Sequence, residues 1–446
     1  MDKQEFAHWA VMRSLQLGAG LAEVFLLDHK SFSVQVRHGR VESIKQAQEK
    51  GAGLRVIADG RMGFAYTSRL EKSIMEDTIA QAIANAGKTA VDENHILPYP
   101  GGESHAELRI YDPTIAATPV EEKIQLAKVI EESAFAYDPR VVRSEHSAYE
   151  DTIYEVVIVN SNGLDVNYRG AFCGGYVWVV AEENDDNQTG AGMDFHLNLA
   201  DLNPEAIGRE AGEQAVMMLG AKKVPSQRVP IVMPPRVATQ FLGVLAPGLS
   251  AEAVQKGRSL LAGKLEQMVA SNLVTLIDDG ALPGGINSSP VDGEGVPTGR
   301  NVLLEQGKLK KYLYNTYTAA RDGIVSTGNA SRSSYRGTPE IGTSNLYLEP
   351  GTWDPKSLLQ DIDQGFYVTE VLGMHTANPI SGDFSVGAAG IWINGGELAY
   401  PVRGVAIAGN ILELFQGVEA LGNDLRFYLG TGSPTIRFQP LMVSGD

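Results

Sequence analysis

The segment from residue 381 to 410 constrains the fold more than any other stretch, because apolar alternation and closely spaced glycines occur together in it. Residues 391–400 alternate around Asn394-Gly395-Gly396, a turn sequence that suits the positive backbone angles of a tight β-hairpin. A second turn is expected at Pro401, and Asn410 is expected to cap a helix over 411–419. Glycines at this density indicate closely approached backbone. The segment therefore predicts a strand-rich C-terminal unit.

The beginning of the chain predicts a mixture of helices and strands. Apolar residues at helical spacing mark one helix around residues 6–12 and another over 71–86. Between them, short alternating segments over 23–27 and 32–37, and a hairpin around Asp59-Gly60, indicate strands. We expect these elements to form an N-terminal α/β-sandwich-like unit.

The region that follows predicts a helix, several strands and a second helix. The helices are expected over 120–137 and 204–219, and the strands over 141–149, 152–160, 165–168 and 175–182. This order is typical of an antiparallel sheet with helices on one face. The fold class is therefore α+β. Taking roughly 150 residues per domain, we expect an N-terminal α+β domain over 1–100, a middle antiparallel sheet domain with flanking helices over 103–222, and a β-rich domain over 228–446.

Charge and cysteine content exclude several classes of protein. The net charge is −17, and no cluster of basic residues stands out, so we expect neither nucleic acid nor an anionic membrane as a partner. Cys173 is the only cysteine, which rules out an intrachain disulfide and fits a reducing compartment. No signal peptide or long apolar span is visible in the sequence. We expect a soluble, cytoplasmic protein.

The histidines do not form a metal-binding motif. The closest pair of the eight, His29 and His38, is nine residues apart, so no two imidazoles can share one turn of a helix as an HExxH peptidase requires. Phosphate-loop, dinucleotide and calcium-loop patterns also fail on spacing. Cys173 lies among apolar and glycine residues with no neighbouring histidine, which favours a buried small side chain over a nucleophile.

Four blocks of the C-terminal half together resemble the TldD/PmbA family, specifically its PmbA branch, also called TldE. The blocks are Asp292-Gly-Glu294-Gly295-Val296-Pro297, Leu309 to Tyr317, Ser326 to Ala330, and Ser381 to Asn410. The metal-bearing branch of that family resembles a zinc peptidase with an HExxxH helix and a later cysteine ligand. The corresponding segment here is Leu242 to Pro247, LGVLAP, which has no histidine or glutamate, and no cysteine follows Cys173. We therefore expect no metal or other cofactor in this chain and no catalytic residue.

Polar residues inside the four blocks are the candidate substrate or interface site. They are Asp292, Glu294, Asn315, Tyr317, Thr327, Asn329, Asp383 and Ser385. One interpretation is that they cap helices and satisfy turn backbone, as these residue types commonly do. The other is that they line a groove in which an extended peptide is held by contacts to its main chain.

The resemblance implies a non-metal subunit of a TldD/TldE-type metallopeptidase complex. A TldD-like partner would supply zinc, and this chain would shape the path of unfolded peptides during proteolysis and peptide maturation, while being inactive alone. The alternative is an independent, homodimeric peptide-binding or regulatory module, in line with the family's older label as a DNA gyrase modulator. A third hypothesis makes the chain itself a hydrolase that uses Asp383, Ser385 or a dispersed histidine, but no complete constellation supports it.

Overall fold

A long antiparallel sheet forms one side of the molecule. The computed structural model describes residues 2–101 and 108–445. The sheet has the order β3-β2-β1-β4-β5-β6. Its strands are β1 (Leu21–Arg37), β2 (Arg40–Ala58), β3 (Arg61–Thr67), β4 (Val141–Asn160), β5 (Asp165–Glu183) and β6 (Asp186–His196). The first three come from the expected N-terminal unit and the last three from the expected middle unit, so the two units share one sheet; the boundary expected between residues 100 and 103 meets residues 102–107, which lie outside the described residues.

The strands are longer than the sequence pattern suggested. Segments predicted as separate strands, such as 23–27 with 32–37, join into single strands that pair without interruption, for example from Glu23 opposite Asn160 to Val36 opposite Ser147. The four intervening residues, Asp28 to Ser31, are polar and resemble a turn in the sequence. They remain in the strand because a partner on each side satisfies their backbone.

Helices cover only one face of this sheet. They are α1 (Lys3–Gln16), α2 (Lys72–Ala86), α3 (Pro113–Ala117), α4 (Val120–Tyr137) and α5 (Pro204–Met217). Buried side chains of α1 and α2 pack under one end of the sheet, and those of α4 and α5 pack under the other. The long helices start and end close to where their apolar spacing predicted. None of the helices within residues 2–101 and 108–445 has the length and apolar composition needed to cross a membrane.

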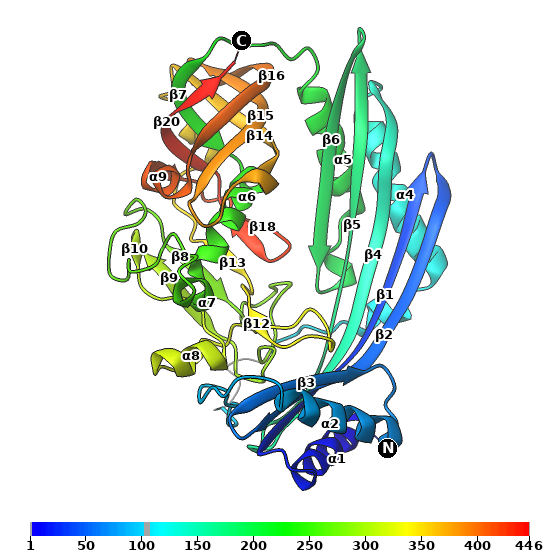
Figure 1. Cartoon of the computed structure of the whole chain (residues 1–446). Coiled ribbons are helices and arrows are strands. Elements are labelled where there is room, and N and C mark those ends of the chain that lie inside the picture. Colours follow the sequence, from blue (N-terminus) through cyan, green and yellow to red (C-terminus); the bar gives the residue numbers. More distant parts are fainter. Residues whose placement is uncertain (1, 102–107, 446) are drawn as a thin grey trace.

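The opposite face of the sheet looks toward a C-terminal unit that begins at β7 (Figure 1). One sheet of this unit has the order β16-β15-β14-β7-β20-β17, and β16 also pairs with β20, which closes most of it into a barrel. Its strands are β7 (Gln227–Met233), β14 (Gln364–Leu372), β15 (Asp383–Asn394), β16 (Glu397–Asn410), β17 (Val418–Leu421) and β20 (Ile436–Ser444). The expected α+β class with a strand-rich C-terminal unit is confirmed.

A second C-terminal sheet lies between the barrel and the N-terminal end of the molecule (Figure 1). Its order is β10-β9-β8-β13-β19-β18. The strands are β8 (Leu276–Asp279), β9 (Arg300–Glu305), β10 (Lys308–Leu309), β13 (Leu346–Leu348), β18 (Arg426–Tyr428) and β19 (Thr431–Ser433), with a separate pair β11 (Ala330–Ser331) and β12 (Glu340–Ile341). The helices of this unit are α6 (Pro235–Leu245), α7 (Ala251–Gln255), α8 (Thr316–Asp322) and α9 (Ile411–Gln416). One large apolar core, which includes Phe241 and Phe366, joins both sheets.

The predicted hairpin and helix cap of the block 381–410 are present, but the turn at Pro401 was wrong. Gly395 and Gly396, both with positive φ, connect β15 to β16. The Asn410 side chain caps α9, which ends at Gln416 rather than at 419. β16 runs through Pro401, because its carbonyl points outward to the Lys222 N–H at 2.9 Å, so the ladder with β15 does not need an N–H at that position.

Candidate functional site

Six of the eight candidate residues gather where the C-terminal unit meets the long sheet. We call the buried centre of this region the junction; it consists of three of these candidates, Asp292, Glu294 and Asn329, together with Arg332 of the C-terminal unit, Glu23 of β1 and Arg55 of β2. The side chains of these six junction residues are almost completely buried. The junction therefore consists of charged and polar groups that are held away from water.

Asp292 organises the turn that carries Glu294. One carboxylate oxygen accepts from the N–H groups of Glu294 and Val296, at 2.9 and 3.0 Å, and the other accepts from the Ala330 N–H at 2.9 Å. Burial and the neighbouring Glu294 carboxylate raise the pKa of Asp292 to about 7, against the effect of these N–H donors. The predicted role of this residue type in turns accounts for its place.

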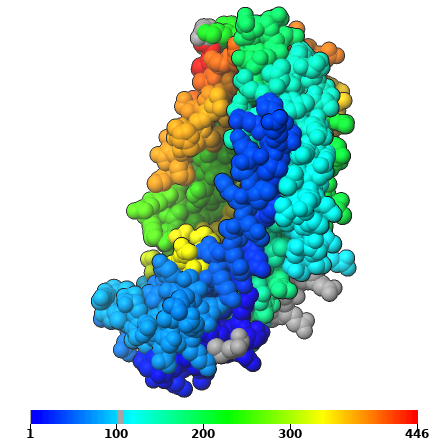
Figure 2. Space-filling model, turned by 90° about the vertical axis from the view of Figure 1, so that its right-hand side faces the viewer, coloured from blue at the N-terminus to red at the C-terminus, as the bar shows by residue number. Residues whose placement is uncertain are grey.

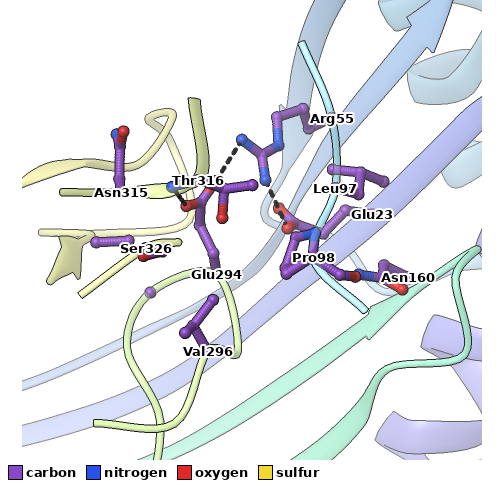
Figure 3. Close-up of polar contacts among 12 residues, drawn as sticks. Glu23, Arg55, Leu97, Pro98, Asn160, Glu294, Val296, Asn315, Thr316 and Ser326 are labelled. Carbon is purple, nitrogen blue, oxygen red and sulfur yellow. Dashed lines mark hydrogen bonds and ion pairs between the residues drawn. The ribbon is translucent and has the colours of Figure 1, made fainter. Parts of the chain in front are cut away.

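Glu294 begins a buried chain of alternating charges (Figure 3). Its carboxylate accepts from the Thr316 N–H at the start of α8 and pairs with Arg55, both at 2.8 Å. The same Arg55 guanidinium pairs with Glu23 at 2.8 Å. Glu23 also pairs with Arg332, whose Nε donates to the Gly293 carbonyl at 2.6 Å. This series of ion pairs forms a closed ring, because Gly293 lies beside Glu294 in the sequence.

The charges in this series of ion pairs compensate one another. Burial alone would raise the pKa of Glu294, but the Arg55 charge and the Thr316 N–H hold it below the ordinary value. Burial alone would lower the pKa of Arg55, but Glu23 and Glu294 raise it. Charged groups without a partner are strongly disfavoured at such depth. These buried ion pairs therefore fix the position of the C-terminal unit against the sheet.

Asn315 and Tyr317 hold α8 at the edge of the junction. Asn315 caps the helix, since its side chain accepts from the Thr318 N–H at 3.0 Å in a reciprocal capping arrangement. The Tyr317 hydroxyl donates to Asp92 at 2.8 Å, and its ring stacks on His95 with centroids 4.9 Å apart. These contacts join α8 to a loop of the N-terminal unit.

Thr327 and Asn329 belong to a buried hydrogen-bond network. The Thr327 hydroxyl lies 2.7 Å from the Asn329 side-chain oxygen and accepts from the Tyr314 N–H at 2.8 Å. The Asn329 side-chain nitrogen donates to Asp278 at 2.6 Å. Burial raises the pKa of Asp278 to about 6, although Asn329 and the Ser344 N–H oppose the shift. The network ties the loop after α8 to strand β8.

Asp383 and Ser385 lie elsewhere, at the exposed start of β15 on the barrel (Figure 1). Asp383 accepts from the Ser381 hydroxyl at 2.8 Å and from the Asn410 side chain at 3.0 Å. These bonds close the loop that leads into α9. The structure thus separates these two residues from the other six, although they belong to the same family blocks.

A cavity of about 400 Å³ adjoins the junction. One wall consists of aromatic and aliphatic side chains of the long sheet, including Tyr154, Tyr168 and Phe172. The other wall consists of C-terminal loops that carry Asp292, Asn329 and several serines. From the side, the surface is recessed between the blue strands and the C-terminal unit (Figure 2). A ligand in this space would meet an apolar surface on one side and hydrogen-bonding groups on the other.

The charged members of the junction other than Asp292 and Glu294 were not identified from the sequence. Glu23, Arg55 and Arg332 come from three distant segments. A usable signal existed for two of them, because Glu23 interrupts the apolar run LAEVFLL and Arg55 interrupts GLRVIA. A charged residue in the middle of a buried strand needs a partner of opposite charge.

The residues present do not fit a metal ion. Leu242 to Pro247 spans the end of α6 and the 3-10 turn after it, and Leu242 is completely buried in the apolar core. Across residues 2–101 and 108–445, no group of three or more His, Cys, Asp or Glu side chains could hold a metal ion. We therefore derive no metal-dependent step for this chain.

Comparisons with known proteins cover nearly the whole chain. The three domains of the PmbA/TldA metallopeptidase models match residues 22–90, 113–219 and 226–445. An uncharacterized protein of Methanocaldococcus jannaschii is 31% identical, over 95% of this chain and 96% of its own length. The metalloprotease PmbA of Escherichia coli O157:H7 is 27% identical, over 98% of this chain and 96% of its own length.

Solved structures share the fold. A Thermotoga maritima protein, described as a candidate modulator of DNA gyrase, superposes with a TM-score of 0.91 at 32% identity and covers 99% of this chain and 100% of its own. TldE from Thermococcus kodakarensis superposes with a TM-score of 0.92 at 24% identity, with coverage of 99% and 100%.

Proposed function

The chain belongs to the PmbA/TldD metallopeptidase family, as its sequence blocks predicted, and we propose that it is the non-metal subunit of a two-chain peptidase. In this proposal a TldD-like partner supplies the zinc and the catalytic base. The present chain forms part of the path along which unfolded peptides reach the partner. We expect the complex to work in the cytoplasm, in proteolysis and peptide maturation.

The observation that carries the proposal is the apolar character of residues 242–247. In the metal-bearing branch of this family, the corresponding segment provides two histidines and a glutamate. Here Leu242 and Leu245 pack into the core, and Gly243 has no side chain. The segment therefore offers neither a zinc ligand nor a base, which supports the proposal that a partner chain supplies the chemistry.

The junction and the adjoining cavity support a role in holding substrate. The buried charges of Glu23, Arg55, Glu294 and Arg332 fix the C-terminal unit at one end of the long sheet. The cavity and the recessed surface then lie between two walls whose spacing is set by this contact. Fixed walls suit a path that must accept many unfolded sequences without closing around one of them.

Reconstitution with a TldD-like partner tests the proposal. The partner alone, this chain alone and the mixture are compared by light scattering after gel filtration and by hydrolysis of a fluorogenic unstructured peptide. We expect a complex of the two chains and hydrolysis that requires both. Chelator should abolish hydrolysis, and zinc should be recovered with the partner. If no complex forms and the partner's hydrolysis is unchanged by this chain, the proposal is wrong.

A second candidate function is an independent regulatory module. It is favoured by the description of the Thermotoga maritima relative, and of one from Bacteroides thetaiotaomicron with 28% identity, as candidate modulators of DNA gyrase. The net charge of −17 disfavours direct contact with DNA, so such an effect would operate through a protein. If the protein forms homodimers that bind peptides and forms no complex with a TldD-like chain, this candidate is supported over the first.

A further inference from the structure

In strands β4 to β6, six aromatic side chains lie on the face of the long sheet that the helices leave uncovered. They are Tyr154 of β4, Tyr168, Phe172, Tyr176 and Trp178 of β5, and Phe195 of β6, and we call this surface the aromatic face. Alternation along the strands places them on one side, while Cys173, Val177 and Val179 pack beneath α4 and α5 on the other. None of the six is fully buried, and Trp178 is 38% exposed.

Two glycines let rings of this face lie against the backbone. A Cβ atom at Gly170 would lie 2.2 Å from the Tyr154 ring, and one at Gly174 would lie 2.2 Å from the Phe195 ring. The rings also meet in pairs: Tyr154 with Tyr168, Phe172 with Phe195, and Tyr176 with Trp178, the last with centroids 5.2 Å apart. The aromatic face therefore consists of three ring pairs along β5 and not of isolated side chains.

Cavities lie at both ends of the aromatic face, and residues of the C-terminal unit form part of the wall in each. The 400 Å³ cavity beside the junction is lined by Tyr154, Tyr168 and Phe172. A cavity of 220 Å³ at the other end is lined by Trp178 together with Arg236 and Glu370. A strand rises about 3.3 Å per residue, so the part of β5 between these ends spans about 33 Å. An extended segment of about ten residues has this length.

The centre of the aromatic face carries an acidic group. Glu150 of β4 lies opposite Gly174 in the sheet and accepts from the hydroxyls of Ser33 and Tyr176, both at 3.2 Å. Within the described part of the chain, no lysine or arginine forms an ion pair with Glu150. A cationic group of a ligand could therefore pair with it, beside aromatic rings that also attract cations.

We propose that the aromatic face binds an extended, unfolded polypeptide segment that carries aromatic and basic side chains. The proposal rests on the proposed function and specifies which peptides this subunit prefers. Aromatic side chains of the segment stack on the paired rings, and a basic side chain pairs with Glu150. Serine side chains of the facing loops that stay exposed, such as Ser331 and Ser333, line the same cavity, where they can meet its main chain. The C-terminal unit stands opposite this face (Figure 1), and the two cavities between them, of about 400 and 220 Å³, suit a single extended segment better than a folded domain.

Fluorescence anisotropy with the full chain tests the proposal. The probe is a labelled, unstructured peptide of about twelve residues that spaces three phenylalanines and two arginines with serine and glycine. Phe172→Ser and Trp178→Ser should each weaken binding about tenfold, as for aromatic anchors elsewhere. The control is Trp353→Ser, which removes an exposed tryptophan outside this face. Thermal melts identify any variant that fails to fold, and Trp178→Phe, which keeps a ring, should retain most of the affinity.

The acidic group has its own test. Glu150→Gln should weaken binding of the arginine peptide several-fold and leave binding of a citrulline peptide unchanged, because only the former carries charge. Equal affinity for both face variants and the Trp353→Ser control, or equal binding of a peptide with serine in place of phenylalanine, overturns the proposal. Face variants that change self-association in light scattering without changing peptide affinity also overturn it, since the occupant would then be a second copy.

The outcomes separate this inference from the subunit role. If the chain forms an active complex with a TldD-like partner and Trp178→Ser leaves peptide affinity and hydrolysis unchanged, the aromatic face is not the binding surface and the subunit role stands. If the isolated chain binds the aromatic peptide through this face but forms no complex, the inference stands without the subunit role.

Discussion

Replacing Arg55 with methionine should strongly destabilise the junction. Methionine retains much of the apolar stem but leaves the fully buried Glu294 carboxylate with the Thr316 N–H as its remaining partner. Glu23 keeps its pair with Arg332. Removing one partner of a buried ion pair typically costs about 3–5 kcal/mol. We expect a loss of this size in the free energy of unfolding, because one buried carboxylate loses its cation.

The loss should depend on pH in a defined direction. In the wild-type chain burial would raise the pKa of Glu294, but Arg55 and Thr316 hold it below its ordinary value, so their contribution is present above the unfolded pKa and is lost as pH falls. In the variant burial acts without the cation, the pKa rises, and stability is lost as pH increases. The difference between wild type and variant should therefore be largest near about pH 7 and shrink toward about pH 5.

Urea unfolding and hydrogen exchange together measure this effect. Exchange should accelerate in peptides covering residues 290–300 and 314–331, which contain the bonded N–H groups. The matched control is Arg140→Met, because Arg140 also pairs with two carboxylates, Asp138 and Glu183, but at the surface, where ion pairs contribute little. Adding Glu294→Leu to Arg55→Met should recover part of the loss. Equal losses in Arg55→Met and Arg140→Met, or a difference that does not change with pH, would refute the reasoning.

Three further predictions concern individual groups. Asp292→Asn should remove one source of pH dependence. With a folded pKa of about 7 for Asp292, the wild type loses stability from this group as pH rises from about 4 to about 7, so urea midpoints should fall less across that range in the variant than in the wild type. Asn329→Ala should lower the free energy of unfolding, measured in urea, by about 1.5–3 kcal/mol, because Asp278 loses a buried hydrogen-bond donor. Carboxyl NMR of this variant should show the Asp278 pKa above about 6, and an unchanged pKa would contradict the assignment. Burial raises the pKa of Cys173 to about 12, so iodoacetamide should label it slowly in the native chain and rapidly in urea.

Local elements were predictable from the sequence because their signals are local. The helix over 120–137 follows from apolar residues at helical spacing, and the turn at Gly395-Gly396 follows from two residues that tolerate positive φ. The shared sheet was not predictable in this way. The pairing of β1 with β4 joins residues far apart in the chain, and no pattern inside either strand specifies the other as its neighbour.

The candidate site shows the same division. Asp292, Glu294 and Asn329 could be identified from the sequence, because tight turns are rich in glycine and in small polar residues. Their charged partners from the long sheet lie in strands, where only a break in apolar alternation marks them. Asp383 and Ser385 also lie close to glycines in the sequence, but they belong to a separate loop on the barrel. Local composition alone therefore does not place a residue in a site.

The pairing of β1 with β4 has a consequence for how the chain is made. Glu23 lies opposite Asn160, and 160 − 23 = 137 residues separate them. At a synthesis rate of about 5–20 residues per second, one edge of β1 waits roughly 7 to 27 seconds for its neighbour while only the hairpin with β2 protects the other edge. A long unpaired strand edge invites pairing with other chains. The nascent protein is therefore most prone to aggregate before β4 emerges from the ribosome, and a chaperone that binds this edge would act in that interval.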